Sequence, residues 1–138
     1  MRAVLDTNVL ISAAIFPHSM PRRAVDLVCA SGEMIFSAAT FMELEDAFFR
    51  AKFDRYIEPL ARVEYVAMLF HAATFARPTE TIRVCRDPKD NQFLEAAIAG
   101  NTALIVTGDR DLRALDPFRG IRIVNPSDFL ALHAPPAV

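Results

Sequence analysis

Short apolar runs alternate along this chain with longer segments in which apolar residues recur every three or four positions. The short runs predict strands at residues 3–5, 34–37, 80–84, 102–108 and 121–124. The longer segments predict helices at residues 7–15, 21–32, 38–53, 59–76, 87–101, 109–115 and 126–132. Helix signals agree with these bounds: Pro21 and Pro88 suit a first helical position, and Gly32 and Gly100 suit a helix end.

Strands that alternate with helices predict parallel pairing, because two parallel strands need a long crossover connection between them. We therefore predict an α/β fold, a three-layer α/β/α sandwich with a mainly parallel central sheet. A chain of 138 residues suits one domain. We expect that domain at residues 1–133, followed by a loose tail at 134–138.

The composition favours a well-filled core and excludes a disordered chain, with 53% hydrophobic residues and a net charge of −2. Such a balance gives no broad basic field, so a nucleic-acid partner would be held by a few Arg or Lys or through metal ions. The apolar stretch 66–76 is too short to span a membrane. Asp6 interrupts any signal peptide, and Cys29 and Cys85 are expected to be reduced core residues. We expect a cytoplasmic protein without a membrane partner.

Acidic residues stand directly after the predicted strands. Asp6 follows the first strand, Asp87 and Asp90 the third, and Asp109 and Asp111 the fourth. Ligands of open parallel sheets bind at the carboxyl ends of the strands. Adjacent strands lie about 4.8 Å apart, so carboxylates from neighbouring strand ends can share one ion. A divalent cation among these oxygens would explain the otherwise costly burial of Asp6.

Structural roles compete with this interpretation. Asp87 and Asp90 would by themselves make a good helix N-terminus, and Asp111 is favoured as a cap. This alternative is weakest for Asp6, because Thr7 or Asn8 could cap the following helix equally well.

The helix predicted at 38–53 carries three further acids, Glu43, Glu45 and Asp46. Helical periodicity does not choose among them, and on pattern alone a solvated face is favoured. The His residues are scattered, so no zinc signature exists, and hard oxygen ligands suit Mg²⁺ or Mn²⁺ better.

The stretches "VLDTNVLISA", "SAATFMELEDAFFRAKF" and "CRDPKDNQFLEAAIAGNTALIVTGDRDL" together resemble the PIN-domain (PilT N-terminal) ribonucleases, in particular the VapC-like toxins of toxin–antitoxin pairs. The resemblance implies that Asp6, Glu43, Asp90 and Asp109 are catalytic metal ligands, and it selects Glu43 over Glu45. It adds Asp87 and Asp111 as further metal ligands, and Asn8 and Thr107 as residues that hold the acids in place.

The same resemblance implies an Mg²⁺- or Mn²⁺-dependent endoribonuclease that hydrolyses phosphodiester bonds of single-stranded or loop RNA. A cognate antitoxin protein and a homodimer are the implied partners, with segments 41–49 and 63–75 as candidates for the dimer interface. Basic residues near the acids are weaker candidates for RNA contacts: Arg22, Arg23, Arg50, Lys52, Lys89 and Arg110.

Two other functions are open at this point. A PIN-like module that binds RNA or protein without catalysis would share the fold, although the retained acids argue against it. A phosphoacceptor receiver domain is also a small α/β sandwich with acids at strand ends. It needs an acidic pair after the first strand and a Lys after the last full-length strand, and the chain has neither.

Overall fold

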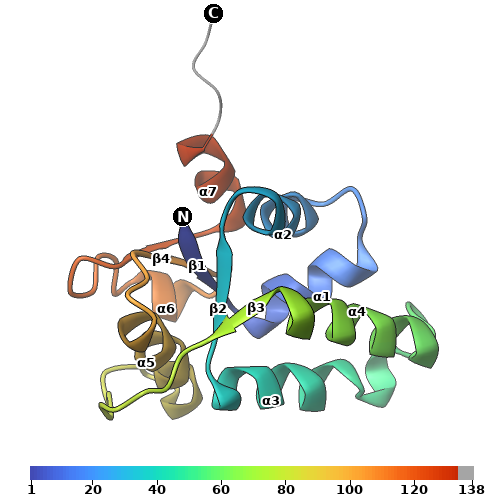
Figure 1. The fold of residues 1–138 in the computed structure, drawn as a ribbon, viewed down its shortest axis with the longest axis horizontal. Coiled ribbons are helices and arrows are strands. Elements are labelled where there is room, and N and C mark those ends of the chain that lie inside the picture. The colour runs from blue at the N-terminus through green and yellow to red at the C-terminus, as the bar shows by residue number, and fades with distance from the viewer. Residues whose placement is uncertain (134–138) are drawn as a thin grey trace, which may run out of the picture.

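The computed structural model describes residues 1–133 and contains a five-stranded, all-parallel sheet in the order β3-β2-β1-β4-β5 (Figure 1). The strands are β1 (Arg2–Leu5), β2 (Glu33–Phe36), β3 (Ala73–Phe75), β4 (Leu104–Val106) and β5 (Arg122–Val124). The helices are α1 (Thr7–Ile15), α2 (Met20–Ser31), α3 (Ala38–Phe48), α4 (Pro59–Ala72), α5 (Asn91–Ala99), α6 (Arg110–Arg113) and α7 (Pro126–Leu132). Two 3-10 turns are η1 (Ala51–Phe53) and η2 (Pro88–Asp90). The predicted parallel α/β architecture is confirmed.

Alternate residues of the strands enter two separate cores on opposite faces of the sheet. On β1, Ala3 and Leu5 join the core formed with α1, α2, α3, α4 and α7, whereas Val4 joins the core formed with α5 and α6. Figure 1 shows α5 and α6 on one side of β1 and β2, and α1, α2 and α4 on the other. The sheet is therefore the middle of three layers.

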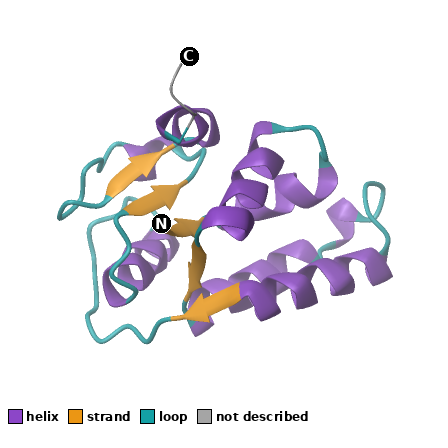
Figure 2. Ribbon diagram, turned by 45° about the horizontal axis from the view of Figure 1, so that its top comes forward, coloured by secondary structure: helices purple, strands orange, loops and turns teal. Residues whose placement is uncertain are grey.

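The edge strand lies elsewhere than predicted. Residues 80–84 form no strand, and the edge strand is Ala73–Phe75, which we placed at the end of a helix. The pairing of β2 with β3 ends α4 at Ala72, although the local sequence suits a helix. The predicted strand is instead part of a loop (Figure 2), whose backbone is bound by side chains of α5.

Several other helices and strands begin or end at residues that differ from the prediction. The helix predicted at 38–53 ends at Phe48, and a separate turn covers 51–53. Ser37, predicted as a strand residue, instead caps α3 in a capping box with Thr40. Cys29 is exposed and is not the core residue that we expected, while Cys85 is half-buried. The tail predicted at 134–138 lies outside the described residues.

The strand order excludes the receiver domain. Receiver domains place their strands in the order 2-1-3-4-5, whereas here β1 lies between β2 and β4. The direction of the connections reverses between β1 and β4, and ligands of such sheets bind at this switch point. No helix in the described part of the chain is long and apolar enough to cross a bilayer.

Candidate functional site

Asp6 lies at the switch point of the sheet, where β1 ends beside β4. The register of these strands pairs Leu5 with Val106, which brings Asp6 next to Thr107. The hydroxyl of Thr107 donates a hydrogen bond to Oδ2 of Asp6. The side chain of Asp6 is thus fixed from the neighbouring strand, and the residue is only 6% exposed.

The other oxygen of Asp6 caps helix α1. Oδ1 accepts a hydrogen bond of 2.9 Å from the backbone N–H of Val9. Capping, the alternative that we judged weakest for Asp6, is therefore present, and neither Thr7 nor Asn8 is the cap. Asn8 is exposed on the first turn of α1. Burial raises the pKa of Asp6, although these hydrogen bonds favour the charged form and oppose the shift.

Thr107 also links Asp6 to Asp109. Its Oγ1 accepts a hydrogen bond of 3.0 Å from the backbone N–H of Asp109. Asp109 caps α6, since its Oδ1 accepts a hydrogen bond of 3.0 Å from the N–H of Asp111. The negative charge of Asp109 contributes to the raised pKa of Asp6, so the two carboxylates lie within electrostatic reach of each other. Asp111 itself is exposed.

Asp90 joins this pair from the start of α5. Burial, a hydrogen bond between its carboxyl group and that of Asp109, and the charges of Asp109, Asp87 and Asp6 raise the pKa of Asp90 to about 7. Asp87 is exposed, and its carboxylate caps the turn η2 by accepting from the N–H of Lys89 at 3.0 Å. The capping role proposed as the alternative for Asp87 is thus present.

Glu43 is the acid of α3 nearest this cluster. It is half-buried, and the side-chain amide of Gln92 on α5 donates a hydrogen bond to its Oε2. Burial raises the pKa of Glu43, the charge of Asp6 raises it further, and Lys89 and Arg50 act in the opposite direction. Glu45 instead lines an apolar groove between α3 and α4, and Asp46 is exposed. We refer below to Asp6, Glu43, Asp90 and Asp109 as the acidic cluster.

Gln92 was missed by the sequence reasoning. Its role depends on the packing of α3 against α5, which places it opposite a residue 49 positions earlier in the chain. No local pattern marks such a contact.

The donor chemistry of the acidic cluster suits a hard divalent cation. Its members supply carboxylate oxygens, the preferred ligands of Mg²⁺. Burial and the charges of neighbouring acids together raise the pKa of Asp90 to about 7, and bound positive charge would offset the repulsion among these acids. As placed, however, no three His, Cys, Asp or Glu side chains within residues 1–133 converge closely enough to hold one ion. The residue types fit a metal, and the carboxylates would have to draw together to bind it.

The basic residues proposed for RNA contacts are spread over the surface. Lys89 and Arg50 lie near enough to Glu43 to lower its pKa. Arg22 forms an ion pair of 3.1 Å with Asp26 on α2, on which Arg23 also lies. Lys52 lies over the ring of Phe53, and Arg110 is exposed on α6. Lys89 and Arg50 are the members of this set with an electrostatic effect on the acidic cluster.

Comparison with known proteins gives consistent matches. A family model described as the PIN domain matches residues 2–111, a range that contains the whole acidic cluster. An uncharacterised protein of Methanocaldococcus jannaschii is 30% identical over 117 residues, which cover 83% of this chain and 75% of that protein.

Solved structures share the fold at low sequence identity. PAE2754 from Pyrobaculum aerophilum superposes with a TM-score of 0.66 at 15% identity, over 98% of this chain and 91% of that one. VapBC2 from Rickettsia felis, bound to a promoter DNA fragment, superposes with a TM-score of 0.61 at 13% identity, over 91% of this chain and 98% of that one. VapBC-1 from nontypeable Haemophilus influenzae superposes with a TM-score of 0.60 at 15% identity, over 92% of this chain and 99% of that one.

Proposed function

Because the chain belongs to the PIN domain family, whose members are generally nucleases, we propose that it is a metal-dependent endoribonuclease acting on single-stranded or loop RNA. One observation carries the proposal. Asp6, Glu43, Asp90 and Asp109 come from four separate parts of the chain, yet the charge of one raises the pKa of another around the switch point. Such a concentration of carboxyl groups, three of them with raised pKa values, is typical of functional sites.

We assign the acidic cluster to metal binding, with Asp87 and Asp111 as outer candidates. Bound Mg²⁺ or Mn²⁺ would supply an activated water and stabilise the leaving oxygen of a phosphodiester. Thr107 and Gln92 orient Asp6 and Glu43 through the hydrogen bonds that they donate. Without metal, burial and the neighbouring acids raise the pKa of Asp90 to about 7, and a bound cation would lower it and keep Asp90 charged as a ligand.

We further propose that the protein is the toxin of a toxin–antitoxin pair. The sequence resemblance to VapC-like toxins supports this, and the fold is shared with structures named VapBC. A small neighbouring gene that encodes a DNA-binding protein is the expected companion. Co-expression of the two should yield a complex that cleaves RNA more slowly than the protein alone.

The direct test is cleavage of a mixed pool of single-stranded RNA in Mn²⁺, with EDTA as the blank. We expect the parent to cut and Asp6→Asn or Asp109→Asn to reduce the rate by at least about a hundredfold, because each removes charge from one shared site. The double variant should be little worse than either single variant, since the residues act as a unit.

Two matched variants control for contamination and for the choice of the second acid. Glu43→Gln should be inactive, whereas Glu45→Gln on the same helix should cut like the parent. If Asp6→Asn cuts as fast as the parent, the activity does not come from this site. Binding of the RNA pool without any cleavage in Mn²⁺ would instead favour the catalytically silent module.

A further inference from the structure

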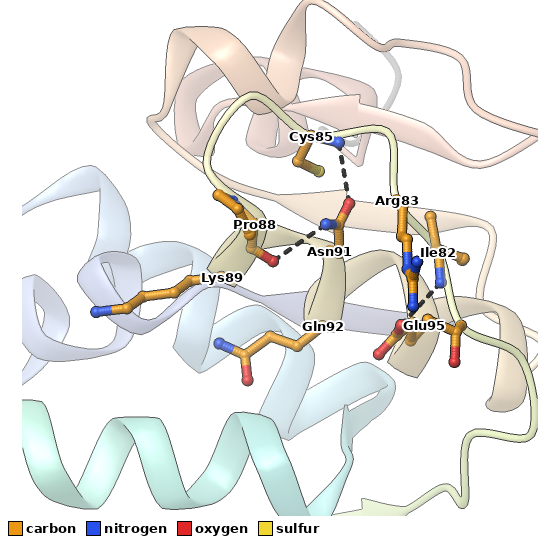
Figure 3. A pocket seen from close by; sticks show the side chains of 9 residues that line it. Ile82, Arg83, Cys85, Pro88, Lys89, Asn91, Gln92 and Glu95 are labelled. Carbon is orange, nitrogen blue, oxygen red and sulfur yellow. Dashed lines mark hydrogen bonds between the residues drawn. The ribbon is translucent and has the colours of Figure 1, made fainter.

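A cavity of about 520 Å³ lies between the loop at 81–89 and helix α5 (Figure 3). This volume is in the range of small-ligand sites. Ile82, Arg83 and Cys85 contribute to it from the loop, and Asn91, Gln92 and Glu95 from α5.

The loop wall of the cavity is fixed by side chains of α5. Oδ1 of Asn91 accepts hydrogen bonds from the N–H groups of Val84 and Cys85, at 3.1 and 2.9 Å, and its Nδ2 donates to the carbonyl of Pro88 at 3.1 Å. One turn later, Glu95 accepts from the N–H of Ile82 at 2.9 Å. A ligand that enters such a preformed cavity need not order the loop, so binding costs less entropy.

Two cations of this cavity are free to bind an anion. Among the ion pairs found within residues 1–133, none involves Arg83 or Lys89. Both residues are exposed, so their charged ends reach solvent. The guanidinium group of Arg83 can bind two phosphate oxygens at once, and the ammonium group of Lys89 acts as a point charge.

Gln92 links the cavity to the acidic cluster, because its side chain lines the cavity. Figure 3 shows the side chains of Lys89 and Gln92 pointing to the same side, away from Arg83. On that side Gln92 donates a hydrogen bond to Glu43 of the acidic cluster. A chain of phosphates that passes the acids at Lys89 would therefore continue along the cavity towards Arg83.

We propose that this cavity is a substrate subsite that holds one nucleotide of single-stranded RNA next to the bond that is cut. The inference rests on the proposed nuclease function. Arg83 binds the phosphate of that nucleotide, Lys89 contacts the phosphate nearer the acidic cluster, and the base lies against the cavity wall. Arg83 is thereby a binding residue for a phosphate that does not react.

The test measures binding of a fluorescein-labelled, single-stranded RNA heptamer of mixed sequence by anisotropy, with the parent in EDTA so that no metal-dependent cleavage occurs. Arg83→Ala should weaken binding about tenfold, as expected for the loss of a charged hydrogen bond. The slope of log Kd against log salt should fall by about 0.7, since one phosphate contact to a single strand is lost. Arg83→Lys should keep most of the slope.

Arg55→Ala is the matched control. Arg55 is also exposed, but it lies between η1 and α4, at the end of the molecule away from α5 (Figure 1). The substitution Arg55→Ala should change neither the affinity for the heptamer nor the slope of log Kd against log salt. In the active protein, Arg83→Ala should raise KM about tenfold and leave kcat within about twofold, because a contact made equally in the ground and transition states affects KM alone.

The outcomes separate this inference from the proposed function. If the parent cleaves RNA but Arg83→Ala binds and cleaves like Arg55→Ala, the subsite is wrong and the nuclease stands. If the parent binds the heptamer through Arg83 but never cleaves, the nuclease is wrong and the subsite stands. A parent that neither binds nor cleaves would overturn both.

Discussion

At the scale of the residue, both carboxylate oxygens of Asp6 make hydrogen bonds within the fold. One of its oxygens caps α1 and the other accepts from Thr107. A carboxylate has about four acceptor positions, so both oxygens can still contact a cation. The energetic cost of burying this acid was visible in the sequence, but the identity of the cap was not, because Asp6, Thr7 and Asn8 all suit that position.

Metal binding should therefore be measurable as stability. We expect Mg²⁺ or Mn²⁺ to raise the melting temperature. At a metal concentration a hundredfold above Kd, the free energy of unfolding should rise by about 2.7 kcal/mol. Asp6→Asn keeps an oxygen for the cap and should abolish most of this rise. Thermal melts with and without EDTA check the expectation, and a parent whose melting temperature ignores both metals would contradict it.

The pKa of Asp90 predicts a pH dependence in the absence of metal. The pKa is about 7 in the folded protein against 3.8 for an ordinary Asp, so the folded state binds a proton that the unfolded chain has already released. Stability should then fall as the pH rises from about 4 to about 7. Asp90→Asn should flatten this dependence. Urea unfolding of both proteins in EDTA across this range measures it, and identical profiles would refute the assignment.

At the scale of the element, the predicted position of Asp87 and Asp90 agrees better with the structure than the predicted edge strand does. Asp87 and Asp90 were placed after a strand at 80–84, whereas that segment is a loop bound to Asn91 and Glu95. The acids nevertheless lie at the predicted edge of the sheet, because α5 starts there. Strand β3 could not be predicted, since only its pairing with β2 distinguishes Ala73–Phe75 from the end of α4.

The loop between α3 and α4 depends on one buried cation. Arg62 is 2% exposed and donates to the carbonyls of Ile57 and Phe48 and, at 2.7 Å, to Asp54. We expect Arg62→Ala to cost about 3 kcal/mol, because hydrogen bonds of a buried charged group are lost together. Asp54→Ala should cost less than about 1 kcal/mol, because that carboxylate is mostly exposed.

Chemical denaturation of the two variants measures this difference. Arg62→Met restores the apolar volume but not the hydrogen bonds, and it should remain less stable than the parent. Equal losses for Arg62→Ala and Asp54→Ala would show that Arg62 does not anchor the loop.

At the scale of the whole molecule, the alternation of strands and helices was enough to predict the parallel sheet, because parallel strands require crossovers. The order of the strands was not predicted, and it decides where the acids meet. Likewise, the choice of Glu43 came from family resemblance, while its contact with Gln92 depends on how two helices pack.

The exposed apolar side chains of α3 and α4 support the predicted homodimer. Met42, Phe49, Val63 and Phe70 are 42–62% exposed and lie in the segments proposed for the interface. Light scattering at micromolar concentration should report a dimer, and Val63→Glu should shift it to the monomer by burying a charge in the interface. Leu132→Glu on α7, a similarly exposed position, serves as the control. A monomeric parent would refute the dimer.

The pairing of β1 with β4 also determines when the acidic cluster can assemble during translation. Thr107 lies 101 residues after Asp6, and Asp109 comes later still. At ribosomal speeds of about 5–20 residues per second, Asp6 waits about 5–20 s for its neighbours to be made. A nascent chain therefore carries Asp6, Glu43 and Asp90 before Thr107 and Asp109 have been made. For a protein proposed to cut RNA, the site can therefore be complete only after Asp109 has left the ribosome.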